Sequence, residues 1–255
     1  MQRSWLKHYG ANVPETIDPD SYDSVVDMML EACEQYGDRM AFSNFGTSKT
    51  YAEVESLSRD FGAYLQQSLG IRHGDRVALM LPNMLAFPVA MLGILRVGAV
   101  QVNVNPLYTP RELEHQLVDA DTDTIVVFAG STATLETAIE ATPIKNVIVV
   151  GLDDLIDAGL QSPPVDDRLA ETIDFIDTLD QGKELDITPV TIRGDDLIYL
   201  QYTGGTTGIS KGAMLSHRNL VANILQFDAF GGDVILPGKE IIVTAIPMYH
   251  IFALM

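Results

Sequence analysis

Residues 77–104, VALMLPNMLAFPVAMLGILRVGAVQVNV, contain the pattern that decides the fold. The apolar runs Val77–Leu81 and Val100–Val104 have the length of buried strands, and Met84–Val97 between them has the length of a helix. Prolines, a glycine and Arg96 interrupt the stretch, so no uncharged span of 18 residues remains for a membrane helix. The segment therefore predicts a strand, a helix and a second strand.

The same alternation continues along the chain and predicts an α/β fold with a mostly parallel, layered sheet. Ser21 precedes the amphipathic stretch Val25–Tyr36. Thr50–Glu53 and Thr109–Glu112 have the pattern of capping boxes, and the first opens a helix predicted to reach Gly70. The predicted strands are Arg76–Leu81, Val100–Val104, Thr124–Phe128, Asn146–Val150, Leu197–Tyr202 and Ile241–Ile246.

Composition limits the class of protein. The 255 residues include 35 acids and 16 bases, and the formal charge of −19 argues against a nucleic-acid-binding protein. Cys33 is the single cysteine, which excludes an internal disulfide and favours a reducing compartment. The N-terminus lacks the apolar run of a secretory signal. We expect a soluble, cytoplasmic chain.

Residues 151–187 differ from the rest because they contain 11 acids and two bases. A calcium loop would need acidic residues at regular short spacing, and these acids are scattered. We interpret the stretch as a solvated excursion between two halves of the fold and predict no metal ligand in the chain.

The loop at residues 200–212, LQYTGGTTGISKG, carries the chemistry. Its glycines allow the backbone to turn several N–H groups to one side, and Thr203, Thr206 and Thr207 add hydroxyls. Lys211 adds a positive charge. No acid occurs between residues 197 and 227, where the mean frequency would place about four. The loop therefore predicts a polyphosphate site, although it is neither a Walker A loop nor a Gly-x-Gly-x-x-Gly motif. The alternative is an ordinary flexible turn.

The threonine–glycine–lysine loop resembles the phosphate-binding signature of the adenylate-forming (acyl-activating) enzymes, and Pro247–Phe252 resembles the next motif of that family. Four further segments resemble the subfamily of bacterial long-chain fatty-acid–CoA ligases, and the resemblance covers nearly the whole chain. These segments are Trp5–Leu6, Val77–Met80, Pro106–Leu113 and Tyr202–Asn219.

The resemblance implies a two-step reaction, in which ATP and a fatty acid give an acyl-adenylate and coenzyme A then displaces AMP. It implies ATP, Mg²⁺ and coenzyme A as cofactors and catalytic roles for Thr206, Lys211 and His250. Tyr249 and His250 are expected to face the substrate, whereas the apolar neighbours of His250 alone would favour a packed core histidine. The expected cofactor-binding residues are Tyr202, Thr203, Gly204, Gly205, Thr206, Thr207, Gly208, Lys211 and Gly212.

The resemblance also implies that the chain is the N-terminal part of a longer ligase. We expect residues 1–190 to form a first α/β subdomain and residues 191–255 to begin a second one, with the C-terminal domain absent and the fragment inactive. The alternatives are a ligase for another carboxylate and a non-catalytic phosphate-binding module. Homodimer formation and peripheral association with the inner membrane stay open.

Overall fold

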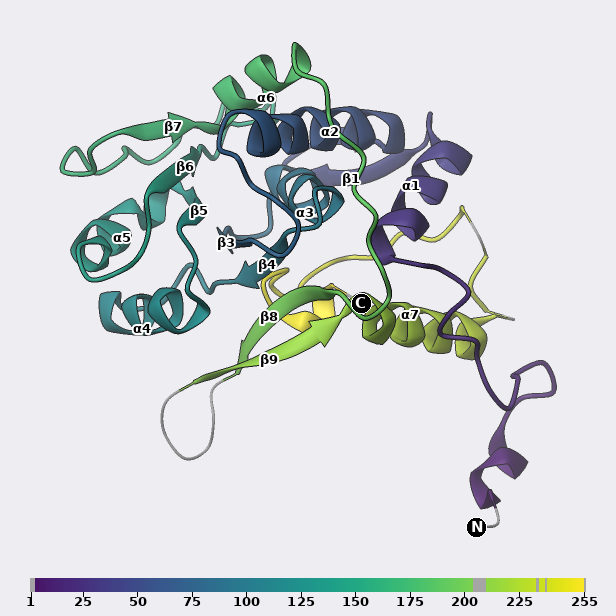
Figure 1. The fold of residues 1–255 in the computed structure, drawn as a ribbon. Helices are drawn as coiled ribbons and strands as arrows, with labels where there is room; N and C mark the ends of the chain where they lie inside the picture. The colour runs from purple at the N-terminus through teal and green to yellow at the C-terminus, as the bar shows by residue number, and fades with distance from the viewer. Residues whose placement is uncertain (1–2, 204–209, 233, 237, 255) are drawn as a thin grey trace.

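A seven-stranded sheet forms the centre of the computed structural model, which describes residues 3–203, 210–232, 234–236 and 238–254 (Figure 1). The strand order is β7-β6-β5-β3-β4-β8-β9, and every neighbouring pair is parallel except β8 and β9. The strands are β3 (Arg76–Met80), β4 (Val100–Asn103), β5 (Thr124–Phe128), β6 (Asn146–Val150), β7 (Thr172–Asp174), β8 (Leu197–Thr203) and β9 (Lys211–Ser216).

Helices cover both faces of this sheet and give three layers (Figure 1). The helices are α1 (Val25–Tyr36), α2 (Tyr51–Gln67), α3 (Ala86–Arg96), α4 (Pro110–Ala120), α5 (Thr132–Ile139), α6 (Phe175–Lys183) and α7 (His217–Gly231). Helices α4 and α5 bury one sheet face, and the remaining five share the core on the other. Short 3₁₀ turns occur at η1 (Ser4–His8), η2 (Ala129–Ser131) and η3 (Ile251–Ala253).

The parallel arrangement determines where a site can form. The carboxyl ends of parallel strands meet at one edge of a sheet, and ligands of open α/β folds bind in the loops there. Strand β4 lies between β3 and β8, so the segments that follow these three strands become neighbours. Among the helices of the described chain, none combines the length and apolarity needed to cross a membrane.

The fold class predicted from the sequence is confirmed, as are five of the six predicted strands. The prediction of a strand at Ile241–Ile246 is wrong, because this segment pairs with no described strand. Its first three residues are 78–85% exposed. β-branched residues favour extended backbone, but a strand also needs a neighbour with free N–H and C=O groups. Here β9 forms the edge beside β8 instead.

The helix starts follow the predicted capping patterns. Thr50 and Thr109 both accept a hydrogen bond from the backbone N–H three residues on, and both capping boxes are complete. Helix α1 has the predicted bounds, but its cap is Ser24 rather than Ser21, with the Ser24 side chain accepting from Asp27 N. Helix α2 ends at Gln67, before Gly70, which adopts a left-handed φ of 72°.

The interpretation of residues 151–187 as a solvated excursion is wrong for its second half. Strand β7 pairs with β6, and α6 follows it directly. Phe175 at the start of α6 is fully buried and lies 5.2 Å from Phe61 of α2, measured between ring centroids. The acids of α6 lie on its exposed side, so one amphipathic helix explains both the charge and the burial.

His217 is a buried polar link between α1 and α7. Its side chain is 1% exposed, and Nδ1 accepts a hydrogen bond of 3.2 Å from the backbone N–H of Val25. Burial lowers the pKa of His217 to about 4, although the nearby carboxylates of Asp196 and Asp27 oppose this shift. The imidazole is therefore neutral near pH 7.

This lowered pKa makes stability depend on pH. Between pH 6.5 and 4 the unfolded chain binds a proton that native His217 excludes, so we expect about 3 kcal/mol of stability to be lost as pH falls through this window. His217→Asn keeps an acceptor and cannot titrate, so this loss should disappear from its curve of unfolding free energy against pH, measured with urea.

Asp154 also titrates in this pH range, but its contribution is the same in the two proteins and cancels from the difference in unfolding free energy. Burial raises the pKa of Asp154 to about 6, so its contribution to stability falls as pH rises from 4 to 6, opposite in sign to that of His217. Both proteins contain Asp154, and the difference between their curves isolates His217. His8→Asn, at an exposed histidine, is the control. Parallel curves for His217→Asn and the unsubstituted chain would contradict the assignment.

Candidate functional site

The predicted phosphate-binding loop joins β8 and β9. These two strands are antiparallel, and Thr203 lies directly opposite Lys211 in their register. Both residues are exposed, so their side chains stand at the mouth of the connection between the strands. The predicted residues outside the described chain are Gly204, Gly205, Thr206, Thr207 and Gly208.

Helix α4 forms hydrogen bonds with both sides of this hairpin. The hydroxyl of Tyr202, on β8, donates a 2.6 Å hydrogen bond to Asp119 Oδ2. His115, one turn earlier on α4, lies with Nε2 3.0 Å from the carbonyl oxygen of Ser210, the residue before β9. Burial and the Asp119 carboxylate raise the pKa of Tyr202, so its hydroxyl stays protonated and keeps this bond.

Gly212 allows strands β8 and β9 to approach each other closely. A Cβ atom at Gly212 would lie 3.0 Å from the ring of Tyr202, so only glycine lets β9 approach β8 this closely without a shift. Tyr202 itself is 7% exposed. Both residues were predicted as cofactor-binding, and the structure pairs them in the register position next to Thr203 and Lys211.

The second predicted motif contacts β8 through Gln201. The backbone carbonyl of Tyr249 accepts a 3.2 Å hydrogen bond from Gln201 Nε2. His250 is exposed, and its Nδ1 accepts from Phe252 N at 3.3 Å, which caps the 3₁₀ turn η3. The exposure rules out the packed core histidine that the neighbouring apolar residues alone would favour. Among the described residues, the one hydrogen bond of the imidazole uses Nδ1.

Folding changes the charge environment inferred from the sequence. The stretch without acids, residues 197–227, receives carboxylates from elsewhere in the described chain, because Asp119 contacts Tyr202 and Asp20 contacts Arg218. The Asp119 carboxylate is engaged with the Tyr202 hydroxyl, one register position from the Thr203–Lys211 pair. Arg218, near the start of α7, forms two hydrogen bonds with Asp20 of the N-terminal segment.

A family model described as AMP-binding enzyme matches residues 29–255 of the chain. The chain belongs to this family. The match includes the hairpin and the Tyr249–His250 motif, and it confirms the resemblance inferred from the sequence. The seven-stranded sheet agrees with solved members of the family, because residues covering 96% of the chain superpose on a long-chain-fatty-acid-CoA ligase from Archaeoglobus fulgidus with a TM-score of 0.76. The identity to that protein is 27%, over 46% of its length.

Curated relatives of this family member include a long-chain-fatty-acid–CoA ligase from Escherichia coli O6:H1. It is 45% identical over the whole chain, which covers 47% of the relative's length. A 4-coumarate–CoA ligase from Humulus lupulus is 32% identical over 88% of the chain and 39% of its own length. The chain thus spans about half the length of the curated relatives that it matches.

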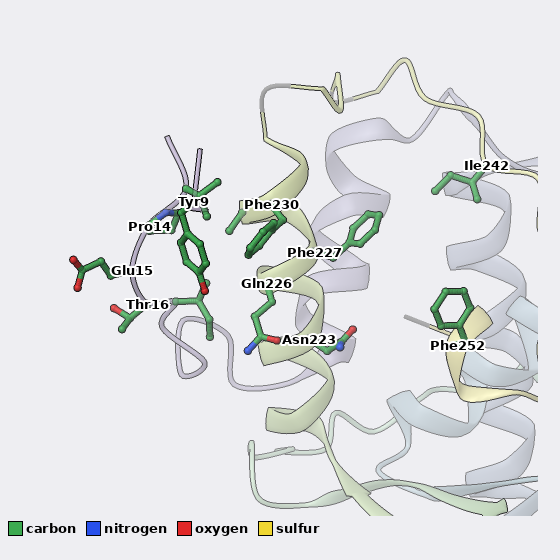
Figure 2. Close-up of a pocket in the computed structure, with 13 residues that line it drawn as sticks. Tyr9, Pro14, Glu15, Thr16, Asn223, Gln226, Phe227, Phe230, Ile242 and Phe252 are labelled. Carbon is green, nitrogen blue, oxygen red and sulfur yellow. The ribbon is translucent and has the colours of Figure 1, made fainter. Parts of the chain in front are cut away.

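A groove of about 710 Å³ is lined by the N-terminal segment, by α7, and by Ile242 and Phe252 of the C-terminal segment (Figure 2). Phe227 and Phe230 project from α7, and Tyr9 meets the Phe230 ring edge-on at 5.1 Å. None of the predicted site residues lines the groove, but Phe252, two residues after His250, does. The groove is therefore an apolar surface that reaches the second motif and not the phosphate-binding hairpin.

Several residues that shape the site were assigned no role from the sequence. His115 and Asp119 hold the hairpin, and Asn83, Asn103 and Gln201 form hydrogen bonds that lead to the Tyr249 motif. A polar amide within an apolar strand is the one signal that could have found Asn103 and Gln201. Contacts of His115 and Asp119 join residues more than 80 positions apart, and local sequence carries no such information.

Proposed function

We propose that this chain is the N-terminal part of a long-chain fatty-acid–CoA ligase. A fatty-acid carboxylate oxygen attacks the α-phosphorus of ATP, the bond to pyrophosphate breaks, and an acyl-adenylate forms. The thiol of coenzyme A then attacks the acyl carbon, loses its proton, and releases AMP. The observation that carries the proposal is the 45% identity to a curated ligase of that name across the whole chain, motifs included.

The phosphate-binding hairpin suits the first step. Charge develops on the departing pyrophosphate, and donors placed in advance stabilise it. We assign this role to Thr206, Thr207 and Lys211, with the backbone of Gly204, Gly205 and Gly208 and the side chain of Thr203 completing the set. Lys211 and Thr203 lie opposite each other at the end of the ladder, and Tyr202 and Gly212 pack closely at the next position, which supports this assignment.

The Tyr249–His250 motif suits the carboxylate side of the reaction. We assign His250 to the acid–phosphate junction and Tyr249 to the wall of the acyl site. Phe252 extends from this motif into the apolar groove, where hydrocarbon would replace water at favourable free energy. The assignment rests on the exposure of His250 and on the position of Phe252.

ATP, Mg²⁺ and coenzyme A are the proposed cofactors. Mg²⁺ neutralises phosphate charge. The described residues contain no cluster of three or more His, Cys, Asp or Glu side chains able to hold a metal ion, so we assign no ligand for it here. We further propose a cytoplasmic location, a subdomain division near residue 190, homodimer formation and peripheral association with the inner membrane.

Fatty-acid-dependent exchange between ATP and pyrophosphate, measured on the complete gene product, tests the proposal. We expect exchange that requires a fatty acid and rises with acyl length to a long-chain optimum, because each added buried CH₂ contributes roughly 0.8 kcal/mol. An optimum with aryl or medium-chain acids would favour a ligase for another carboxylate. Nucleotide binding without exchange for any acid would favour a phosphate-binding module.

A further inference from the structure

The side chain of Asn83 forms hydrogen bonds with the backbone just before Tyr249 and His250. It follows β3 by three residues, and β4 lies between β3 and β8 in the sheet. Its Nδ2 donates to the carbonyl oxygens of Thr244 and Ile246, at 2.9 and 3.0 Å. Its Oδ1 accepts from Met248 N at 2.7 Å. One side chain thus fixes three backbone groups of the segment 244–250.

Gln201, on β8, forms a hydrogen bond with the same segment. Its Nε2 donates to the Tyr249 carbonyl, and its Oε1 accepts from Asn103 Nδ2 at 2.9 Å. Asn103 in turn accepts from Gln101 Nε2 at 2.6 Å. Three buried amides on β4 and β8 therefore donate in one direction, toward Tyr249. Such an aligned chain strengthens each of its hydrogen bonds.

These amides are costly for the fold. Gln101, Asn103 and Gln201 are at most 6% exposed, and apolar residues would fill their strand positions without leaving polar atoms to satisfy. Gln101 Oε1 has no hydrogen-bond partner among the described residues. Gln116 Oε1 on α4 is unsatisfied as well, so what distinguishes the three amides is the common direction of their donors, toward Tyr249.

The segment that the amides hold lacks other regular support. Residues 241–246 pair with no described strand, and Ile241–Val243 are mostly exposed. Asn83 and Gln201 supply four hydrogen bonds between the segment 244–250 and the body of the domain. Gln201 lies two residues before Thr203, on the strand that enters the phosphate-binding hairpin. One side chain thus couples the hairpin to the His250 motif.

We infer that Asn83 and Gln201 are positioning residues that hold His250 at a fixed place relative to the phosphate-binding hairpin. The inference rests on the proposed function, in which the hairpin binds ATP and His250 meets the carboxylate. Neither amide touches a reacting atom. Both act through the backbone of the segment 244–250, so their loss should affect the alignment of the two substrates more than the binding of ATP.

Hydrogen exchange tests the holding role without any activity. Asn83→Leu and Gln201→Met remove the hydrogen bonds at similar volume. In the 255-residue chain, we expect at least tenfold faster amide exchange in peptides from residues 244–254, with β6 peptides unchanged. Gln116→Met is the matched control. Gln116 is a fully buried amide that donates to the Asn103 backbone carbonyl, and its described hydrogen bonds include none to the segment 244–250. Unchanged exchange in the two variants, or equal loosening by the control, would overturn the inference.

Kinetics of the complete gene product tests the positioning role. For Gln201→Met we expect kcat of ATP–pyrophosphate exchange to fall at least tenfold while KM for ATP changes less than twofold. In a His250→Ala background the same substitution should have little further effect. A full additional loss there would overturn the inference, as would unchanged kcat. Absence of exchange in the unsubstituted protein would instead contradict the proposed function, and the hydrogen-exchange result would still decide whether the amides hold the segment.

Discussion

Replacing Lys211 by alanine should lower kcat of fatty-acid-dependent ATP–pyrophosphate exchange by about 100- to 1000-fold, the usual cost of removing one donor from a site of developing charge. Lys211 begins β9 directly opposite Thr203, at the mouth of the hairpin, and its side chain is exposed. A flexible ammonium group in this position can reach the phosphates without first breaking a core contact. Initial rates with saturating ATP and fatty acid measure the effect.

Lys183→Ala is the matched control, because Lys183 is an exposed lysine in the last turn of α6, remote in sequence from the hairpin. It should retain activity within about twofold, as is usual for surface substitutions. A loss of less than fivefold for Lys211→Ala would reject its role in phosphate stabilisation. The exposure of Lys211 makes the result easy to interpret, because its truncation leaves no cavity in the core.

The sheet could be predicted because its central strands are continuous apolar runs. Strands β3 to β6 are buried on both faces, and such strands carry a strong local signal. The two-stranded sheet of β1 (Met40–Asn44) and β2 (Thr47–Thr50) has no such signal. Its turn uses Phe45 and Gly46, both with positive φ, where Asn-Gly would be the recognisable pair.

The elements at the sheet edges were harder to predict for a different reason. Strand β7 has three residues within an acidic stretch, and β9 mixes exposed and half-buried residues. Their extended structure comes from the neighbour that each one pairs with. The apolar segment at 241–246 shows the converse, since it has the residues of a strand and no described partner. Local propensity therefore identifies central strands better than edges.

Prediction of the site divides in the same way. The hairpin loop was visible because glycine, threonine and lysine lie close together in the sequence. Asn83 was not visible, because its three hydrogen bonds reach residues more than 160 positions later. Asp119 and His115 were not visible for the same reason, because they contact residues more than 80 positions later. The chemistry of the site is local in sequence, whereas the contacts that hold it are made by the fold.

Substituting Gly182 by alanine should destabilise the chain by about 3 kcal/mol, the upper range for an overpacked contact. Gly182 lies on α6, and a Cβ there would overlap the backbone carbonyl of Asp60 on α2. Backbone cannot rotate away as a side chain can, so α6 would have to move. That movement would separate the buried rings of Phe61 and Phe175, which pack between these helices.

Intrinsic helix propensity predicts the opposite sign for Gly182→Ala, because alanine in a helix is favoured over glycine by about 1 kcal/mol. We expect net destabilisation, because the clash involves backbone atoms and its cost of about 3 kcal/mol exceeds the gain of about 1 kcal/mol from helix propensity. Urea unfolding of the 255-residue chain measures the difference through its midpoint at unchanged slope. Gln181→Ala, at the exposed neighbouring position, is the control and should stay within about 0.5 kcal/mol of the unsubstituted chain. If Gly182→Ala instead raised the midpoint, α2 and α6 would not be in close backbone contact, and propensity would dominate at this position.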